Sequence, residues 1–146
     1  MGTTIYTIGF AGRTAQSFFE DLASSGVRSL LDIRLRPDGQ LAGFAKRQDL
    51  PFFLQRLVDG CAYRHLPELA PTDAILKTFR AEKDWDAYVT AFEALMDERN
   101  IPGELDPTIF GDACLLCSEA TVAQCHRRLV AERLARAWPG TEIRHL

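Results

Sequence analysis

Residues 3–33 read TTIYTIGFAGRTAQSFFEDLASSGVRSLLDI, and the order of the patterns within them predicts the architecture. The first six residues are rich in β-branched side chains and stop at Gly9, as is typical of a strand. Thr14 can cap a helix whose apolar residues recur at helical spacing, and Gly26 stands where that helix should end. Residues 27–33 form a second, mostly apolar run, which is typical of a strand covered on both faces. Strand, helix and strand in this order predict a parallel unit.

The rest of the chain continues the alternation of strands and helices. Further strands are predicted at residues 61–66, 113–117 and 141–145, and further helices at residues 50–59, 73–81, 84–96 and 121–138. Residues 34–49 contain a Pro and two Gly and predict a long loop, a feature that is usually functional or mobile. We therefore expect one α/β domain over residues 1–146. It should have three layers, with a mostly parallel sheet of about five strands flanked by helices. The strand order stays open.

The composition limits the classes of protein to consider. With 47% hydrophobic and 25% charged residues, the chain resembles an ordinary globular domain. Its apolar runs are too short for a membrane span and no secretory signal pattern is present, so we expect a cytoplasmic protein without a membrane partner. The four cysteines lack the spacing of a disulfide framework and are expected to be free thiols.

The charges argue against one class of partner and leave another open. A net charge of -3 argues against a general nucleic-acid coat, whose affinity comes from neutralising phosphates. Of the 17 basic residues three are Lys, which leaves 14 Arg. Arg suits fixed recognition of carboxylates and phosphates, although a GC-rich genome explains the excess more simply.

Polar residues follow the predicted strands at the points where they end. In an open parallel sheet, ligands bind beyond the carboxyl ends of the strands. The residues at these ends are Gly9, Gly12 and Arg13 after the first strand, Asp32 and Arg34 after the second, His65 after the third, Cys117 and Glu119 after the fourth, and His145 after the fifth. Their joint placement at one edge of the sheet is the best functional evidence in the sequence.

The first two strand ends point to an anion. GFAGRT, residues 9–14, is neither a Walker loop nor G-x-G-x-x-G, yet it places two Gly and Arg13 before a helix N-terminus, where free amides attract anions. A tight turn with an N-cap explains it equally well. Asp32 and Arg34 share one face of a strand. They are expected to form an internal ion pair, to direct Arg34 toward a ligand, or both, and Arg36 and Lys46 in the long loop could close over an anion.

The segment LLCSEATVAQCHRR, residues 115–128, combines thiols, a carboxylate, an imidazole and guanidinium groups. Cys114 and Cys117 would point to opposite faces of a strand, so we reject a C-x-x-C site and expect Cys114 to be a small buried hydrophobe. On the predicted helix His126 would face the sheet, whereas Arg127 would point elsewhere. His126 then either serves in a site or is a satisfied core residue.

Two kinds of chemistry compete for this segment. A metal site needs at least three of Cys117, Glu119, Cys125 and His126 to converge. Adjacent helical residues diverge by about 100°, so Cys125 and His126 should not share an ion, and we expect no metal. A thiol nucleophile needs a nearby base and a lowered pKa, and Cys117 satisfies this description best, with Glu119 and His126 as acid–base groups. Glu119 could instead cap the free amides of the helix.

These residues together resemble a known family. TIGFAGRT, LLDIR followed by P, YRHLPEL and LLCSEATVAQCHRRLVAERL are similar to the motifs of the bacterial family catalogued as domain of unknown function 488. The chain departs from the family pattern at residues 69–71 and at residues 10–11. The resemblance implies an α/β fold and a site but no established reaction. The positions that it marks are Gly9, Asp32, Arg34, Pro37, Tyr63, His65, Leu69, Cys117, Glu119, Cys125, His126 and Arg127. LLDIR also resembles a segment of rhodanese-like sulfurtransferases, but no Arg follows Cys117 at the spacing those enzymes have.

Three functions follow from the sequence. The first is a cleft that binds a phosphate-bearing ligand, a nucleotide or a nucleic-acid end, through Arg13, Arg34 and Arg127, with Glu119 and His126 as acid–base groups. The second is a cysteine-dependent enzyme that acts through Cys117. The third is a non-catalytic binding or regulatory module. The sequence leaves the cofactor and the oligomeric state open.

Overall fold

A parallel sheet forms the centre of the molecule in the computed structural model, which describes residues 2–146 apart from the side chains of Gln40 and Leu41. All its pairings are parallel and its strand order is β3-β2-β4-β1-β5. The strands are β1 (Thr3–Gly9), β2 (Ser29–Asp32), β3 (Ala62–His65), β4 (Ala113–Cys117) and β5 (Thr141–His145). The predicted α/β class and the sheet of about five strands are confirmed. The order, which the sequence left open, places β4 between β1 and β2.

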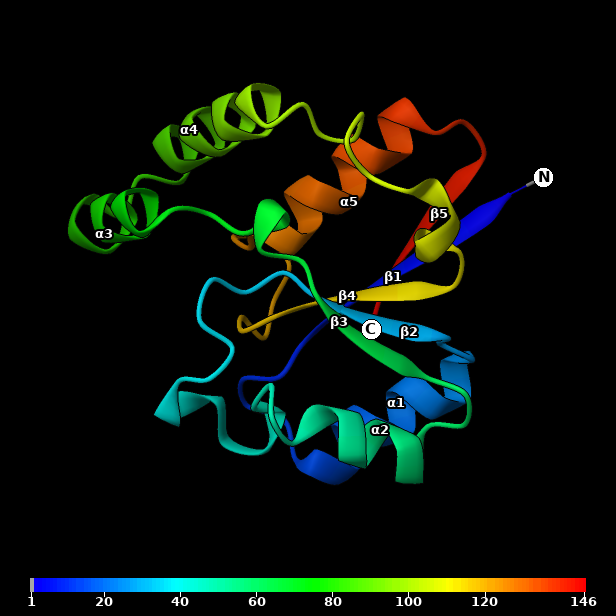
Figure 1. Ribbon diagram of the computed structural model, residues 1–146. Helices are drawn as coiled ribbons and strands as arrows, with labels where there is room; N and C mark the ends of the chain where they lie inside the picture. Colours follow the sequence, from blue (N-terminus) through cyan, green and yellow to red (C-terminus); the bar gives the residue numbers. More distant parts are fainter. Residues whose placement is uncertain (1) are drawn as a thin grey trace.

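Helices cover both faces of this sheet (Figure 1). The α-helices are α1 (Ala15–Ser25), α2 (Leu50–Leu57), α3 (Asp73–Glu82), α4 (Trp85–Glu98) and α5 (His126–Ala137). Short 3₁₀ turns lie at η1 (Gln40–Ala45), η2 (Pro67–Leu69) and η3 (Pro107–Phe110). Thr14 caps α1 by accepting a hydrogen bond from the Ser17 amide, and Gly26 ends it in a left-handed conformation, as the sequence predicts. None of the helices in the described residues could cross a membrane.

The two faces of the sheet carry separate hydrophobic cores, one under α1 and α2 and the other under α4 and α5. Side chains of β4 alternate between them: Cys114 packs in the first core and Cys117 in the second. The two sulfurs therefore lie on opposite faces, as the sequence predicts. Cys114 is a fully buried free thiol, and burial raises its pKa well above the ordinary range.

The last helix differs from its prediction. We expected it to begin near residue 121, but α5 begins at His126, and Cys125 before it has an extended backbone with φ of -138°. Residues 118–125 are instead a loop, held by the hydrogen bond from the Ala11 amide, in the turn after β1, to the Ser118 carbonyl. Because Val122 is not helical, the apolar stripe of α5 is set by Val130, Ala131 and Leu134, and Arg127 lies on it.

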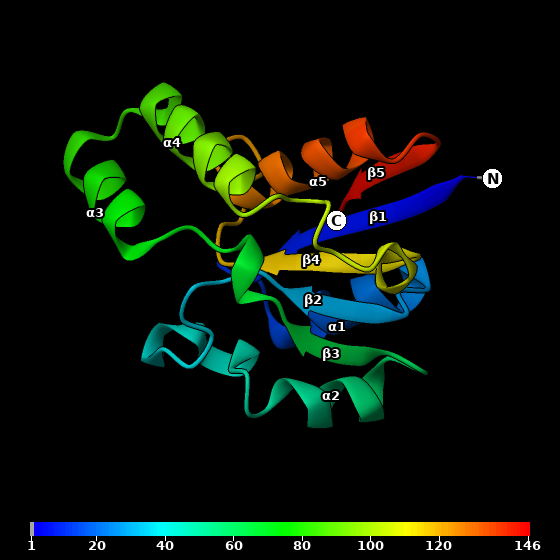
Figure 2. The same ribbon diagram turned by 45° about the horizontal axis from the view of Figure 1, so that its top comes forward.

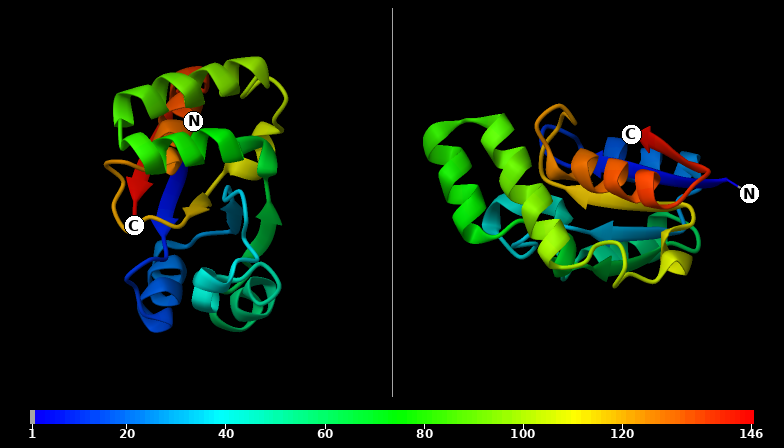
Figure 3. Two further views of the ribbon diagram at one scale, coloured as in Figure 1. Left: turned by 90° about the vertical axis from the view of Figure 1, so that its left-hand side faces the viewer. Right: turned by 90° about the horizontal axis from the view of Figure 1, so that it is seen from above.

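Two segments extend past the carboxyl ends of the strands. The loop between β2 and α2, with η1, lies at this end of the sheet on one side, and α3 lies on the other (Figures 2 and 3). Strand β1 begins at the opposite end of the sheet. The carboxyl ends of the strands, where ligands bind in open parallel sheets, therefore lie between these two segments.

Candidate functional site

A cleft of about 590 Å³ opens at the carboxyl ends of three adjacent strands. The lining residues at these strand ends are Phe10 and Ala11 after β1, residues 34–36 after β2, and residues 117–119 at the end of β4. The remaining lining residues come from the η1 loop, from the segment that includes α3, and from the start of α5: Gly39, Ala42, Pro71, Leu76, Arg80 and His126. The rim inferred from the sequence is therefore built mainly by the three central strands.

Arg34 is held in this cleft by Asp32. Its Nε and Nη2 atoms donate to the two carboxylate oxygens of Asp32 at 2.8 and 2.6 Å, and its backbone amide donates to the same group at 3.2 Å. The Asp32 side chain is fully buried and that of Arg34 is 5% exposed. Bidentate pairing of this kind fixes both the position and the plane of a guanidinium group. The internal ion pair expected from the sequence is present.

One atom of Arg34 has no partner among the described residues. Its Nη1 is buried without a hydrogen bond, while the residue itself lines the cleft. The guanidinium also lies 5.3 Å from the centre of the Phe10 ring, an additional contact that holds its orientation. An unpaired buried donor is costly, so this N–H is suited to an acceptor that enters from the cleft.

Tyr63 and His65 support the pair from β3 rather than line the cleft. The Tyr63 hydroxyl donates to Asp32 at 2.6 Å, and burial together with this contact raises the pKa of Tyr63, so the hydroxyl stays protonated. His65 Nε2 donates to the Arg34 carbonyl oxygen at 2.9 Å, since a carbonyl can only accept. Both residues, predicted to bind ligand, are placed where they position Arg34.

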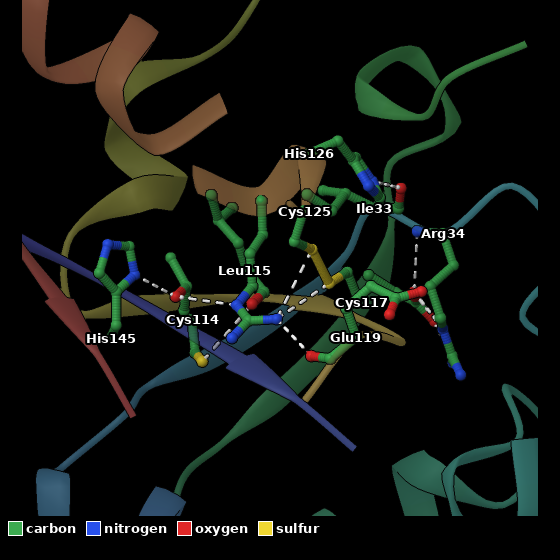
Figure 4. The surroundings of a disulfide bond; sticks show 12 residues. Ile33, Arg34, Cys114, Leu115, Cys117, Glu119, Cys125, His126 and His145 are labelled. Carbon is green, nitrogen blue, oxygen red and sulfur yellow. Dashed lines mark hydrogen bonds and ion pairs between the residues drawn. A yellow bond between two sulfur atoms is a disulfide. The ribbon is translucent and has the colours of Figure 1, made fainter. Parts of the chain in front are cut away.

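The sequence predicted free thiols throughout, but the two cysteines at this site are bonded to each other. A disulfide joins Cys117 at the end of β4 to Cys125 at the start of α5 (Figure 4), whereas Cys61 and Cys114 are free. The prediction is wrong for this pair because the loop of residues 118–124 brings Cys125 back to the end of β4. Cys117 is 1% exposed and lines the cleft, whereas Cys125 is 2% exposed and is not among the lining residues.

Arg127 is buried beneath this disulfide instead of pointing away from the sheet. The residue is 1% exposed. Its Nη1 donates to the Glu119 carbonyl and to the sulfurs of Cys117 and Cys125, at 3.2 and 3.6 Å for the sulfurs, and its Nε donates to Thr7. The expected orientation was wrong because the stripe of α5 was placed from Val122. Arg127 joins β1, β4 and α5 internally and is not among the residues that line the cleft.

His126 stands at the first turn of α5, beside the disulfide (Figure 4). Its Nε2 donates to the Ile33 carbonyl at 2.7 Å, and its ring packs edge-on against Phe92. Burial lowers the pKa of His126 to about 4, and Arg127 acts in the same direction while the Ile33 contact and Asp32 oppose it. The ring is therefore neutral near pH 7, with a free lone pair on Nδ1.

The comparisons with known proteins identify the family. The family model described as Domain of unknown function DUF488 matches residues 14–134, which is most of the chain. The chain belongs to the DUF488 family. No curated protein and no solved structure matches it. The resemblance inferred from the motifs is thus confirmed, and membership in DUF488 supplies no reaction.

Other predicted site residues of this DUF488 chain lie outside the cleft. Arg13 turns along α1, where Nη1 donates to Ser17 and pairs with Asp21 at 2.6 Å. Gly12 adopts a φ of 74° in the turn after β1, which favours glycine. His145, at the end of β5, contacts the Thr7 hydroxyl at 2.6 Å. These residues form the turn before α1 and the far edge of the sheet.

Gly9 has a packing role at the end of β1. A Cβ atom there would lie 1.6 Å from the Glu119 carbonyl oxygen and 2.7 Å from Arg127 Nη1. The absent side chain thus lets the residue 118–124 loop approach β1. Glu119 itself is exposed and lines the cleft, and α5 has no side-chain cap, so the capping role considered for Glu119 is absent.

Sequence reasoning missed Arg80. This exposed residue lies on α3, one turn after Leu76, and both line the cleft. Arg36, in the loop considered for anion closure, also lines the cleft and pairs with Asp73 at 2.8 Å. The only signal for Arg80 was its place on a weak amphipathic helix, since nothing in the sequence shows that α3 extends past the strand ends.

His126 predicts a pH dependence of stability in the oxidised protein. Because its folded pKa, about 4, lies below the ordinary 6.5, the unfolded chain takes up the proton first as the pH falls. The stabilisation is complete above pH 6.5 and is lost as the pH falls from there to about 4. Since the ring is only partly buried, we expect a loss on the order of 2 kcal/mol in the free energy of unfolding. Urea unfolding measured across this range should show it.

The control for this prediction is His126→Asn, which removes the titration and keeps a side-chain N–H. Its stability should change less across the same pH window than that of the wild type. An equally steep decline in both proteins would contradict the assignment.

Proposed function

We propose that the cleft binds a phosphate-bearing ligand, a nucleotide or a nucleic-acid end, through Arg34. The observation that carries the proposal is the buried Nη1 atom of Arg34, a residue that lines the cleft; this atom has no hydrogen-bond partner in residues 2–146. A charge-assisted hydrogen bond to an anionic oxygen would satisfy it. Because Asp32 occupies the other edge of the guanidinium, the orientation of this donor is fixed before a ligand arrives.

The surroundings suit an anion of moderate size. Arg36 and Arg80 stand at the rim, and Glu119 is the acidic residue among those that line the cleft. A volume of about 590 Å³ is within the range of small-molecule sites. The oxygens of a phosphate group could reach Arg34 at the base while the rest of the ligand lies between the rim arginines.

The proposal concerns binding rather than a reaction. With a pKa of about 4, His126 is already deprotonated at neutral pH and is a weak base, so it is poorly matched to acid–base work there. Glu119 remains a candidate base at the rim. Binding alone accounts for the fixed guanidinium and its unpaired donor.

Equilibrium titration with inorganic phosphate, a 5′-mononucleotide, and an oligonucleotide with and without its 5′-phosphate tests the proposal. Asp32→Leu/Arg34→Met removes both members of the buried pair, so no buried charge is left unpaired. We expect the best phosphate ligand to bind this variant about 10- to 100-fold more weakly than wild type, as befits a lost hydrogen bond to a charged group. Circular dichroism checks that the variant is folded.

The control for the loss of an arginine outside the cleft is Arg28→Ala. Arg28 is exposed and precedes the same strand, β2, at the opposite end of the sheet from the cleft. Its removal changes the net charge by one unit without touching the cleft, so affinity should stay close to that of wild type. Equal affinities for wild type and the double variant would refute the proposal.

A second candidate is cysteine-dependent chemistry at Cys117. The observation in its favour is the hydrogen bond from Arg127 Nη1 to the Cys117 sulfur at 3.2 Å, since a nearby guanidinium stabilises a thiolate. The disulfide must first be reduced. Rapid alkylation of Cys117 near neutral pH in the reduced protein would support this function. Labelling slower than that of Cys61, whose thiol pKa burial raises to about 11, would count against it.

A further inference from the structure

Three metal-ligating side chains meet beside the cleft. The sulfurs of Cys117 and Cys125 and a ring nitrogen of His126 all lie within 4.8 Å of one another (Figure 4). The sequence argued against this set because it placed Cys125 and His126 on one helix, where neighbouring side chains diverge. Cys125 instead has an extended backbone before α5, so the argument fails.

The imidazole of His126 has one nitrogen hydrogen-bonded to the backbone, as metal-bound histidines do. Its Nε2–H is used by the Ile33 carbonyl at 2.7 Å, which fixes the tautomer and leaves the lone pair on Nδ1. Metal-bound histidines almost always donate their other N–H to a carbonyl or carboxylate in this way. The hydrogen bond also restrains the ring in the absence of an ion.

The environment of the sulfurs favours thiolates once the disulfide is reduced. Arg127 Nη1 lies 3.2 Å from the Cys117 sulfur and 3.6 Å from that of Cys125, and no side-chain carboxylate pairs with Arg127 among the described residues. A buried guanidinium without a carboxylate is best balanced by negative charge nearby. The Cα atoms of Cys117 and Cys125 are 7.7 Å apart, whereas the Cα atoms of disulfide-bonded cysteines are usually about 4.4–6.8 Å apart. A pair of thiolates sharing an ion tolerates a wider spacing.

We propose that the reduced protein binds one thiophilic divalent cation, Zn²⁺ in the first instance, through Cys117, Cys125 and His126. A dithiol or a phosphine supplies the two electrons that cleave the disulfide and is itself oxidised to a cyclic disulfide or a phosphine oxide. As the ion binds, each thiol loses its proton to solvent, and the neutral imidazole loses none. Two thiolates and one imidazole are a ligand set that favours zinc over magnesium or calcium.

Three protein ligands leave one position of a tetrahedral ion open. Cys117 and His126 both line the cleft, so that position would face the same space as Arg34. The open position is what distinguishes a zinc ion that can take a ligand from a closed structural site. An anion bound by Arg34 could then reach the metal ion. This contact rests on the proposed function, whereas metal binding itself does not.

Titration of the phosphine-reduced protein with Co²⁺ and Zn²⁺ under nitrogen tests the site. We expect one Co²⁺ per chain with thiolate-to-cobalt charge-transfer absorption, displaced by one equivalent of Zn²⁺. Cys117→Ser and Cys125→Ser should each weaken Zn²⁺ binding by more than about 100-fold, beyond the loss typical of an indirect contact. Cys61→Ser, at a free thiol before β3, is the matched control and should bind like wild type.

A second readout uses the wild-type protein and needs no variant. In reduced wild type, Zn²⁺ should protect Cys117 and Cys125 from alkylation while Cys61 still reacts, as mapped by mass spectrometry. Labelling unaffected by Zn²⁺, or cobalt bound without a charge-transfer band, would overturn the proposal. Phosphate binding is measured on the oxidised protein, where the disulfide blocks the ion, so failure of one site is distinguishable from failure of the other.

Discussion

Asp32→Asn is expected to lower the free energy of unfolding by about 3–5 kcal/mol, the cost of breaking a buried ion pair from one side. The fully buried Asp32 carboxylate accepts four hydrogen bonds, three from Arg34 and one from Tyr63. Asn offers a single acceptor oxygen, and its NH₂ group would face donors of Arg34 or Tyr63. The remaining guanidinium charge is then buried without compensation. Urea denaturation of both proteins at neutral pH measures the difference.

Two further variants distinguish the loss of the buried ion pair from the loss of an exposed one. Glu142→Gln breaks the Arg144–Glu142 pair, whose side chains are 58% and 59% exposed, and should cost less than about 1 kcal/mol. Asp32→Leu/Arg34→Met removes both buried charges and should recover much of the stability lost in Asp32→Asn. If Asp32→Asn costs no more than Glu142→Gln, Arg34 is not held as described.

Gly9→Ala is expected to lower the free energy of unfolding by about 3 kcal/mol or more, at the upper end of overpacking effects. The new methyl group would overlap the Glu119 carbonyl oxygen, and backbone atoms cannot move aside as a flexible side chain can. The loop of residues 118–124 must then separate from β1, which disturbs the contact between Arg127 and Glu119. Thermal and urea unfolding would both report the loss.

Gly111→Ala is the control for this substitution. An added Cβ at Gly111 meets nothing within 4 Å, and its φ of -65° suits any residue. Its stability should stay within about 0.5 kcal/mol of wild type. Similar stabilities for Gly9→Ala and Gly111→Ala would show that the loop does not pack against β1 as closely as described.

Local pattern was enough to predict the fold class and most elements. The strand at residues 113–117 and the capped helix after Thr14 follow from side-chain periodicity and turn residues near each end. The strand order could not be predicted, because parallel strands are paired by contacts between segments distant in the sequence. The start of α5 was missed because Val122 continues the apolar pattern of the helix, although residues 118–125 form a loop that is hydrogen-bonded to the turn after β1.

The candidate site was predicted in outline and wrong in detail for similar reasons. Residues at the ends of β1, β2 and β4 do meet at one edge, as the sheet rule implies. The partner of each polar group depends on the direction of its side chain. This direction changes when a helix begins at another residue than predicted. Hence Arg127 turned inward beneath the sulfurs, and Cys125 came beside Cys117 and His126. The Arg80 contribution needs the position of α3, which no local signal specifies.

The most direct test of the central claim is a crystal structure of the oxidised protein with a bound 5′-mononucleotide. We expect a phosphate oxygen within hydrogen-bonding distance of Arg34 Nη1, with the Asp32–Arg34 pair unchanged and the rest of the ligand between Arg36 and Arg80. A saturating ligand whose phosphate lies elsewhere, with no acceptor at Arg34 Nη1, would contradict it.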